Sequence, residues 1–362
     1  MRNKQRFRRI FPVVAAALVV AACGGGEGAA EQSTTTTAPS TTTTEAPPTT
    51  QVPDTTEPVD GAFPVTVPHA FGETTIDAPP TRVVAWGWAT ADALVALDVI
   101  PVAIPFQAYG GDADGVLPWI REALEQGGHE IPTVLPDSAE PPFEAIAAAA
   151  PDLILAPYSG ITEQDYALLS EIAPTVAYPE QPWATPWRET IRIVATAVGK
   201  TAEAEALLAD IDARVAAAGA AHPEIAGKTV AVVWPTPDTF YVYKPADPRV
   251  QFIEDLGFES AASVTQLGEG GETFYFTLSL EQLDQLTSDV LVVYADTQAG
   301  IDEFLASDAA ALMPQVASGG VAAVVGQEFI ASVSPPTALS LTWGLDEYVE
   351  IVAAAAAAVD AG

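Results

Sequence analysis

The side chains best suited to chemistry in this sequence are aromatic rings and two cations that come at or after short apolar runs. Trp88, Tyr109 and Tyr158 follow the first three of these runs. The second half of the chain supplies six more candidates: Trp234, Tyr241, Tyr243, Lys244, Arg249 and Tyr294. Aromatic walls with a few polar donors suit ligand binding, and their π faces attract cationic ligands. Packing at strand ends is the alternative role for each ring.

Residue patterns that carry catalysis do not occur in this sequence. It contains no G-x-S-x-G elbow, no H-E-x-x-H pair and no P-loop, so a secreted hydrolase is the least favoured function. The stretch GGDADG at 110–115 loosely resembles a calcium loop. Alignment on Gly115 nevertheless puts Gly110 and Arg121 where that loop needs carboxylates, which excludes such a site.

Short apolar runs alternate with stretches of helical pattern from residue 63 onward. The runs predict buried strands at 82–86, 100–104, 152–156, 229–234, 289–294 and 321–325. The intervening pattern predicts helices at 91–97, 119–125 and 163–172. This alternation indicates α/β lobes with parallel sheets, whose loops at the carboxyl ends of the strands form a cleft. Trp234 and Tyr294 end their predicted strands, and the other aromatic candidates stand on those loops.

One pattern occurs in both halves of the chain. FEAIAAAAPDLIL parallels LEQLDQLTSDVLV, and in each an Asp follows a Glu by eight residues and opens an apolar strand. The matched pairs are Glu144 with Asp152 and Glu281 with Asp289. The repeat predicts two structurally related lobes.

Residues 185–222 are expected to bridge the lobes. Thr185 is a candidate N-cap before Pro186, Gly199 a helix stop, and Thr201 the cap of a second helix. An apolar stripe at helical spacing follows: Ala204, Leu207, Leu208, Ile211 and Val215. A helix of about 20 residues spans roughly 30 Å. It would act as a stiff connector, so we expect the cleft to close only modestly.

The N-terminus has the three parts of an export signal. Basic residues precede an apolar run from Ile10 to Ala22, which is too short to span a bilayer of about 30 Å. Arg8 and Arg9 also resemble a twin-arginine signal. LVVAAC resembles a bacterial lipoprotein signal, in which the cysteine is lipidated and becomes the mature N-terminus. Cys23, the only cysteine, would then anchor the protein on the extracytoplasmic face of the cell membrane.

The chain after the signal is strongly acidic. Without the five cations of the signal, nine Lys and Arg stand against 48 Asp and Glu, a net charge of −39. Such a surface repels nucleic acid and anionic lipid, so only the lipid anchor is expected to contact the membrane. The chain divides into signal peptide 1–22, disordered Thr/Pro-rich tether 23–62, N-terminal α/β lobe 63–184, bridging segment 185–222 and C-terminal α/β lobe 223–362.

These features together resemble the periplasmic-type iron–siderophore binding proteins of ABC importers. The likeness runs from Val67 to the C-terminus through stretches such as DGVLPWI, LLSEIAPTVAYP, DPRVQFIEDLGF and SLEQLDQL. Members of that family have two Rossmann-like lobes joined by a long interdomain helix and bind a metal chelate between them. The resemblance implies a monomeric binding protein that is no enzyme and needs no cofactor. Its ligand would be a ferric siderophore, with the iron held by the chelator.

The resemblance also implies a partner, the transmembrane subunits of an ABC permease. Family members dock on the permease through one acidic residue of each lobe, and Glu144 and Glu281 stand at the matching positions. A carboxylate in the first turn of a helix also suits the helix dipole, which is the alternative reason for both residues.

Charge narrows the ligand class that the resemblance implies. The second lobe offers only three cations, Lys228, Lys244 and Arg249, which favours a hydroxamate over a multiply anionic triscatecholate or carboxylate siderophore.

Haem and cobalamin are the alternative ligands, because related branches with this fold bind them. Haem needs an axial His or Tyr. The histidines follow no strand and are expected to be solvated: His69, His129 and His222. Tyrosine ligation stays open. A carrier of bare Zn²⁺ or Mn²⁺ would need a cluster of His and carboxylates, which the sequence does not show.

Overall fold

The computed structural model describes residues 62–236, 239–270 and 274–361. The predicted signal peptide, the lipidation site Cys23 and the tether up to residue 61 lie outside these residues. None of the helices in the described part is both long enough and apolar enough to cross a bilayer.

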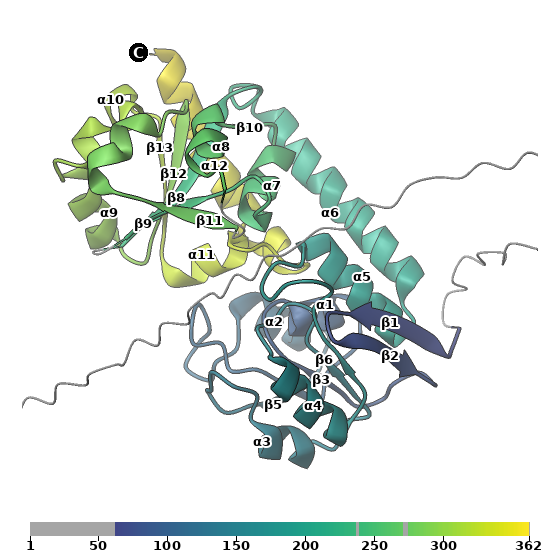
Figure 1. The fold of residues 1–362 in the computed structure, drawn as a ribbon. Coiled ribbons are helices and arrows are strands. Elements are labelled where there is room, and N and C mark those ends of the chain that lie inside the picture. The colour runs from purple at the N-terminus through teal and green to yellow at the C-terminus, as the bar shows by residue number, and fades with distance from the viewer. Residues whose placement is uncertain (1–61, 237–238, 271–273, 362) are drawn as a thin grey trace, which may run out of the picture. The chain divides into compact units, whose positions relative to one another are not determined.

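The N-terminal lobe contains five short parallel strands in the order β5-β4-β3-β6-β7 (Figure 1). Their bounds are β3 Val83–Ala85, β4 Ala103–Ile104, β5 Thr133–Val134, β6 Leu153–Leu155 and β7 Thr175–Val176. The helices are α1 Thr90–Ala96, α2 Pro118–Gln126, α3 Phe143–Ala148 and α4 Glu163–Ile172. An antiparallel pair precedes them, β1 Val65–His69 and β2 Gly72–Ile76. The predicted strands and helices of this lobe are all confirmed, although β4 is shorter than expected.

The C-terminal lobe contains a six-stranded sheet in the order β11-β9-β8-β12-β13, with β10 also paired to β8. The strands are β8 Thr229–Pro235, β9 Phe240–Tyr243, β10 Glu259–Ser260, β11 Tyr275–Leu278, β12 Val290–Ala295 and β13 Val321–Val325. The α-helices are α7 Pro248–Asp255, α8 Ala262–Leu267, α9 Gln298–Leu305, α10 Pro314–Ser318, α11 Gln327–Val333 and α12 Ser340–Ala361. Two 3₁₀ helices complete the lobe, η1 Leu280–Gln285 and η2 Ala310–Leu312.

The two-lobe α/β architecture is confirmed, but the second sheet is mixed rather than parallel throughout. β9 runs antiparallel to β8, and β11 runs antiparallel to β9. The Thr236 hydroxyl and amide both donate to the carbonyl of Thr239, which turns the chain back on itself after β8. The following residues, FYVY, are aromatic or β-branched and suit a strand. Tyr241 and Tyr243 therefore lie on a strand instead of the expected loop.

The predicted internal repeat has the same local structure in both lobes. The Asp152 carboxylate accepts hydrogen bonds from the amide and hydroxyl of Thr81, just before β3. The Asp289 carboxylate accepts the corresponding bonds from Thr229, the first residue of β8. Each Asp directly precedes a strand, β6 or β12. Its hydrogen bonds fix the start of the neighbouring central strand of its lobe, β3 or β8. The hydrogen bonds lower the pKa of Asp289, with the backbone amide of Thr229 as the main cause.

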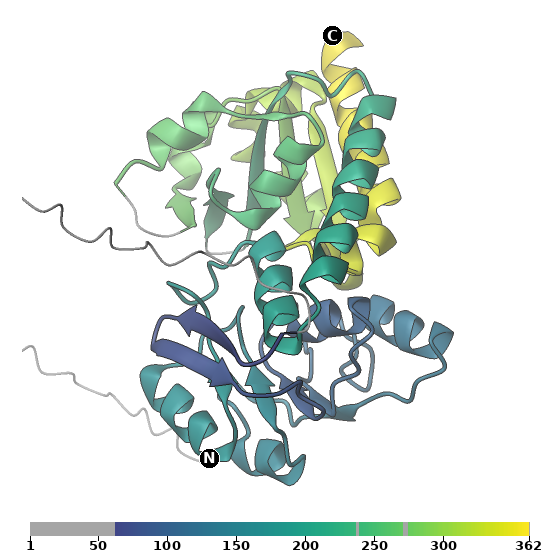
Figure 2. The ribbon, with the colours of Figure 1, turned by 90° about the vertical axis from the view of Figure 1, so that its right-hand side faces the viewer.

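Two helices connect the lobes. α5, Trp187–Val198, packs on α1 and β1, whereas α6, Thr201–Ala221, packs on α5, α7 and α12. Figure 2 shows α6 beside α12 on the C-terminal lobe. The predicted stripe on α6 is buried at Ala204, Leu208, Ile211 and Val215, whereas Leu207 is only half-buried.

The predicted helix stop at Gly199 is confirmed, but both predicted N-caps are wrong. Gly199 ends α5 in the left-handed conformation that suits glycine. Pro186 is the N-cap of α5, and the Thr185 hydroxyl donates to the carbonyl of Pro157 at 2.6 Å instead of capping the helix. Lys200 is the N-cap of α6, and Thr201 is already the first helical residue.

A buried carboxylate on α1 also joins the lobes. Asp92 is 1% exposed and accepts hydrogen bonds from the Trp119 indole at 2.6 Å and the Thr337 hydroxyl at 2.5 Å. The amide of Leu339 donates to its second oxygen at 2.8 Å. Thr337 and Leu339 belong to the segment between α11 and α12. Asp92 therefore links the N-terminal lobe by hydrogen bonds to the segment between α11 and α12 of the C-terminal lobe.

We predict that Asp92 makes stability depend on pH. Burial raises its pKa to about 6, although the hydrogen bonds from Thr337, Leu339 and Trp119 oppose this shift. The folded chain then holds the proton more tightly than the unfolded chain. The Asp92 contribution to the unfolding free energy is thus complete below pH 4 and falls as pH rises through 6, by up to about 3 kcal/mol.

Urea unfolding of the wild type and of Asp92→Asn across pH 4 to 7 measures this effect. The stability difference, wild type minus variant, should shrink over that range and stay constant above it. The exposed Asp308→Asn is the control, and its difference from the wild type should follow no such course. A difference for Asp92→Asn that is constant or grows with pH would contradict the prediction.

Candidate ligand-binding site

A cavity of about 290 Å³ lies between the lobes, where loops at the carboxyl ends of both sheets meet. We call it the interlobe cavity, and its lining residues are Trp88, Tyr109, Tyr158, Trp183, Trp234, Arg249, Phe274, Ser334 and Pro335. An open hollow of about 320 Å³ shares Trp234, Arg249 and Phe274 with it and extends to Tyr241 and Tyr243. Most of the predicted site residues thus surround one space.

A glycine allows the first wall of the interlobe cavity to form. The amide of Trp88 donates to the carbonyl of Tyr158 at 3.0 Å, which pairs the loops after β3 and β6. Gly87 has φ of +84°, and a Cβ there would lie 2.4 Å from the Tyr158 carbonyl oxygen. Only glycine permits this close approach, which brings Trp88 and Tyr158 to the same wall.

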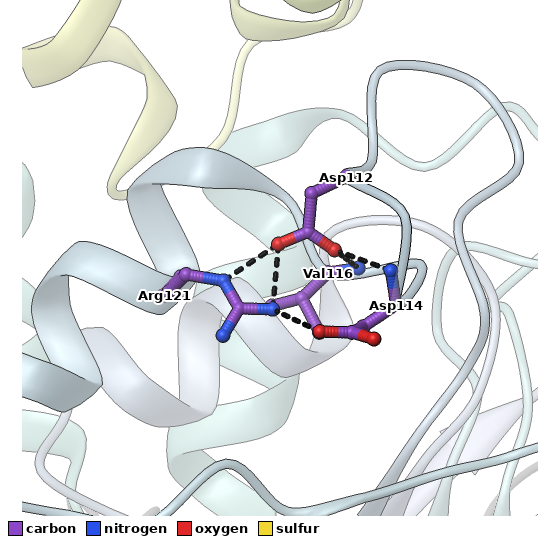
Figure 3. A network of polar contacts seen from close by, with 4 residues as sticks. All are labelled: Asp112, Asp114, Val116 and Arg121. Carbon is purple, nitrogen blue, oxygen red and sulfur yellow. Dashed lines mark hydrogen bonds and ion pairs between the residues drawn. The ribbon is translucent and has the colours of Figure 1, made fainter.

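The loop that carries Tyr109 is braced by the acidic stretch at 110–115. One oxygen of Asp112 accepts from the amides of Asp114 and Val116 at 2.9 and 3.1 Å, and the other pairs with Arg121 at 2.6 Å (Figure 3). Arg121 also contacts Asp114 at 3.2 Å and, by hydrogen bonding, lowers the pKa of Asp112. Arg121 thus forms ion pairs with both carboxylates, in agreement with the exclusion of a calcium loop.

Aromatic rings from both lobes meet at Trp234. Its ring centroid lies 5.9 Å from that of Tyr109 in the N-terminal lobe and 5.8 Å from that of Tyr294 beneath it. Tyr294 is completely buried and also packs against Tyr243 at 6.4 Å. It therefore supports the cavity wall without lining the space. Lys244 is half-buried, and neither cavity includes it among its lining residues.

Arg249 is the cation of the interlobe cavity, and its charge is balanced. Its guanidinium pairs with Asp247 at 2.7 Å, donates to the Ser334 hydroxyl at 2.6 Å and lies 4.3 Å above the Tyr243 ring. Burial disfavours the charged form, but the Asp247 carboxylate and the neighbouring tyrosines together outweigh burial and raise the pKa of Arg249. The pair brings no net charge to the site while leaving a fixed donor at its wall.

Sequence reasoning missed several lining residues, of which Trp183 is the most exposed. Its side chain is 44% exposed, and its ring meets Tyr158 edge-on at 5.7 Å. Its φ of +59° is unusual for a bulky residue. Gly160 makes room for it, since a Cβ there would lie 2.3 Å from the Trp183 indole nitrogen. Trp183 follows β7, so the strand-end rule that selected Trp88 could have identified it.

The other missed residues gave a weaker signal in the sequence. Phe274 precedes β11, a strand that was not expected. Ser334 and Pro335 lie in the connection between the last two helices, separated in sequence from the end of β13 by all of α11.

The two candidate docking residues lie on the surface, one on each lobe. Glu144 is in the first turn of α3, and Glu281 is in the first turn of η1, a 3₁₀ helix rather than an α-helix. Both are exposed. Their matching positions in the repeat support a role in docking on the permease, which stays a prediction for both residues.

The histidines take no part in the cavity, but the expectation that all are solvated was wrong. His69 is 6% exposed on β1, where it pairs with the Thr74 hydroxyl at 2.9 Å and accepts from the amide of Phe71. Tyr166 packs on its ring. His129 is exposed, and His222 is half-buried beside Glu224. Among the described residues, no group of three His, Cys, Asp or Glu could hold a metal ion.

Comparison with known sequences identifies a protein family and two relatives that resemble this chain. A sequence model described as periplasmic binding protein matches residues 83–325. The Fe(3+) dicitrate-binding periplasmic protein FecB of Escherichia coli (strain K12) is 34% identical over 164 residues. That match covers 44% of this chain and only half of FecB. The "Probable siderophore-binding lipoprotein YfiY" of Bacillus subtilis (strain 168) is 29% identical over 233 residues, which cover 63% of this chain and 68% of that protein.

A solved structure shares nearly the whole described fold. Streptococcus pneumoniae TIGR4 PiaA, in complex with ferrichrome, superposes with a TM-score of 0.75 and 32% sequence identity. The match covers 81% of this chain and 99% of PiaA.

We predict that Trp183 contributes to ligand affinity with little effect on stability. Trp183→Ala should weaken ligand binding in the interlobe cavity about tenfold, with ferrichrome, the chelate bound by PiaA, as the probe, because an aromatic face that covers a ligand contributes roughly 1 kcal/mol or more. Titration by tryptophan fluorescence, paired with urea unfolding, measures both effects. Trp343→Ala is the matched control: Trp343 is 38% exposed and packs on Trp119 outside the cavity. Equal affinity losses in the two variants would contradict a role for Trp183 in the site.

Proposed function

The chain belongs to the periplasmic binding protein family, and on that premise we propose that it binds a ferric siderophore for an ABC importer. Proteins of this family are transport components and not enzymes, so the mechanism is capture and presentation without chemistry. The observation that carries the proposal is the interlobe cavity, which is walled by Trp88, Tyr109, Tyr158 and Trp234 from both lobes. An aromatic wall suits the apolar shell of an iron chelate, whose own oxygens coordinate the metal.

The charges of the site favour a ferric hydroxamate. Arg249 is the one cation among the described residues that line the interlobe cavity and the adjoining hollow, and Asp247 neutralises it. A multiply anionic chelate such as ferric dicitrate would enter without compensating charge and would lose its hydration. A neutral or cationic ferric hydroxamate avoids that cost, and the Arg249 donors still reach its carbonyl oxygens.

Haem finds less support at this site. Its axial ligand would be a tyrosinate, because the histidines lie elsewhere. Burial and the hydrogen bond to the Asp296 carboxylate raise the pKa of Tyr109, which disfavours its ionised form. Burial likewise raises the pKa of Tyr158 to about 12. Both tyrosines are therefore better suited to packing and hydrogen bonding than to metal ligation.

Cys23 is proposed as the lipid anchor that keeps the protein on the extracytoplasmic face of the membrane. The sequence LVVAAC supports this, as does similarity to a protein named as a lipoprotein. Incorporation of a labelled fatty acid, lost in Cys23→Ala, tests the assignment. The Thr/Pro-rich segment would be the tether between the anchor and the lobes, and a monomer would suffice to bind one ligand.

Tryptophan fluorescence of the full-length chain, titrated with four ligands, tests the proposed ligand class. We expect saturable quenching by ferrichrome with micromolar or tighter affinity, because Trp88, Trp183 and Trp234 line the cavity. A ferric triscatecholate, haemin and cobalamin should bind at least tenfold more weakly. Preference for haemin or cobalamin would replace the proposed ligand, and no response to any of the four would contradict a siderophore-binding role.

Glu144 and Glu281 are proposed to contact the permease. Glu144→Arg combined with Glu281→Arg should abolish uptake of the iron–siderophore into cells, because positive side chains would replace the two carboxylates proposed to contact the permease. The affinity of the purified variant for the ligand should stay within twofold of the wild type, since both residues are exposed away from the cavity lining. A double variant at the equally exposed Glu163 and Asp308 is the control. Normal uptake by the Glu144/Glu281 variant would disprove the docking role.

A further inference from the structure

A second cavity opens beside the interlobe cavity, within the C-terminal lobe. It has a volume of about 380 Å³ and shares the Trp234 side chain with the interlobe cavity. Its apolar lining comes mainly from Trp234, Phe240 and Phe304. Phe240 is 1% exposed and packs against Phe304 with ring centroids 5.9 Å apart, so this apolar floor is fixed. We call this space the side cavity.

Carboxylates stand at the rim of the side cavity. Asp296 follows β12 and Glu303 lies on α9, and both are exposed members of the lining. Within the described part of the chain neither forms a salt bridge with Lys, Arg or His. An apolar floor with an acidic rim is complementary to a cation carried on an alkyl stem.

Asp296 lies where the two cavities meet. Its carboxylate accepts a hydrogen bond from the Tyr109 hydroxyl at 2.9 Å, across the lobes, and a second from the Gln327 amide at 3.2 Å. Tyr109 lines the interlobe cavity and packs on Trp234. A ligand held against these two rings therefore has a negative charge next to it, on the side that leads to the side cavity.

We propose that the side cavity receives the alkylammonium arm of a ferric hydroxamate whose iron centre lies in the interlobe cavity. The arm's methylenes would pack on Phe304 and Trp234, and its ammonium group would lie between Asp296 and Glu303. This inference rests on the proposed function and narrows it, since it selects cationic chelates over neutral ones of the same iron-binding chemistry.

Titration of the full-length chain with ferrioxamine B and its N-acetyl derivative tests the assignment. The two chelates have the same iron centre, but acetylation removes the charge of the arm. The wild type should bind ferrioxamine B about tenfold more tightly than the derivative at low salt, as expected for an exposed ion pair with a cation–π contribution. In 0.5 M NaCl the ratio should fall towards one, because salt screens exposed charges.

Single-charge variants locate the effect. Asp296→Asn and Glu303→Gln should each lower the ratio at least threefold, and the Asn side chain still offers Tyr109 an acceptor. Asp302→Asn is the matched control: it removes the same charge from α9, one residue away, at a position outside the side-cavity lining. Its ratio should remain that of the wild type.

The outcomes separate this inference from the proposed function. Equal affinities for the two chelates, or a ratio that Asp302→Asn lowers as much as Asp296→Asn does, would overturn the side-cavity assignment while the siderophore role stands. Failure to bind either chelate or ferrichrome would overturn both.

Discussion

The buried carboxylate of Asp92 links the two lobes by hydrogen bonds, and the binding site depends on how the lobes are held together. Tyr109 and Trp234 belong to different lobes, so the wall they form exists only while the lobes hold their positions. A buried carboxylate is tolerated only when donors surround it, and here these come from α2 and from the segment before α12. Together with α5 and α6, this contact joins the two lobes that line the cleft.

The charges of the site show how the C-terminal lobe can offer a hydrogen-bond donor to a ligand without attracting anions. Buried Asp247 balances the charge of Arg249, whose guanidinium lies over the Tyr243 ring at the cavity wall. The charged side chains that line the adjoining side cavity, Asp296 and Glu303, are negative. Under the proposed function, the chain would select its ligand by apolar fit and by tolerance of positive charge, as suits a chelate whose iron is enclosed by neutral hydroxamate oxygens.

Much of this arrangement could be predicted from the sequence, because buried strands leave a strong local signal. Runs such as DLILA and DVLVVY identified β6 and β12. The repeat was recognised because Asp152 and Asp289 each follow a Glu at the same spacing. The strand-end rule brought Trp88, Tyr109 and Trp234 to one cavity. Features set by tertiary contacts could not be predicted: the turn at Thr236 that makes β9 antiparallel, the burial of His69 under Tyr166, and the approach of Ser334 to Arg249.

Anomalous scattering at the iron edge, from crystals of the protein grown with ferrichrome, tests the central claim most directly. The account predicts one iron atom in the interlobe cavity, enclosed by Trp88, Tyr109, Trp183 and Trp234 with an Arg249 donor facing the chelate. An iron atom bound elsewhere, for example among carboxylates on the acidic surface, would contradict the claim that the two lobes meet to hold the chelate.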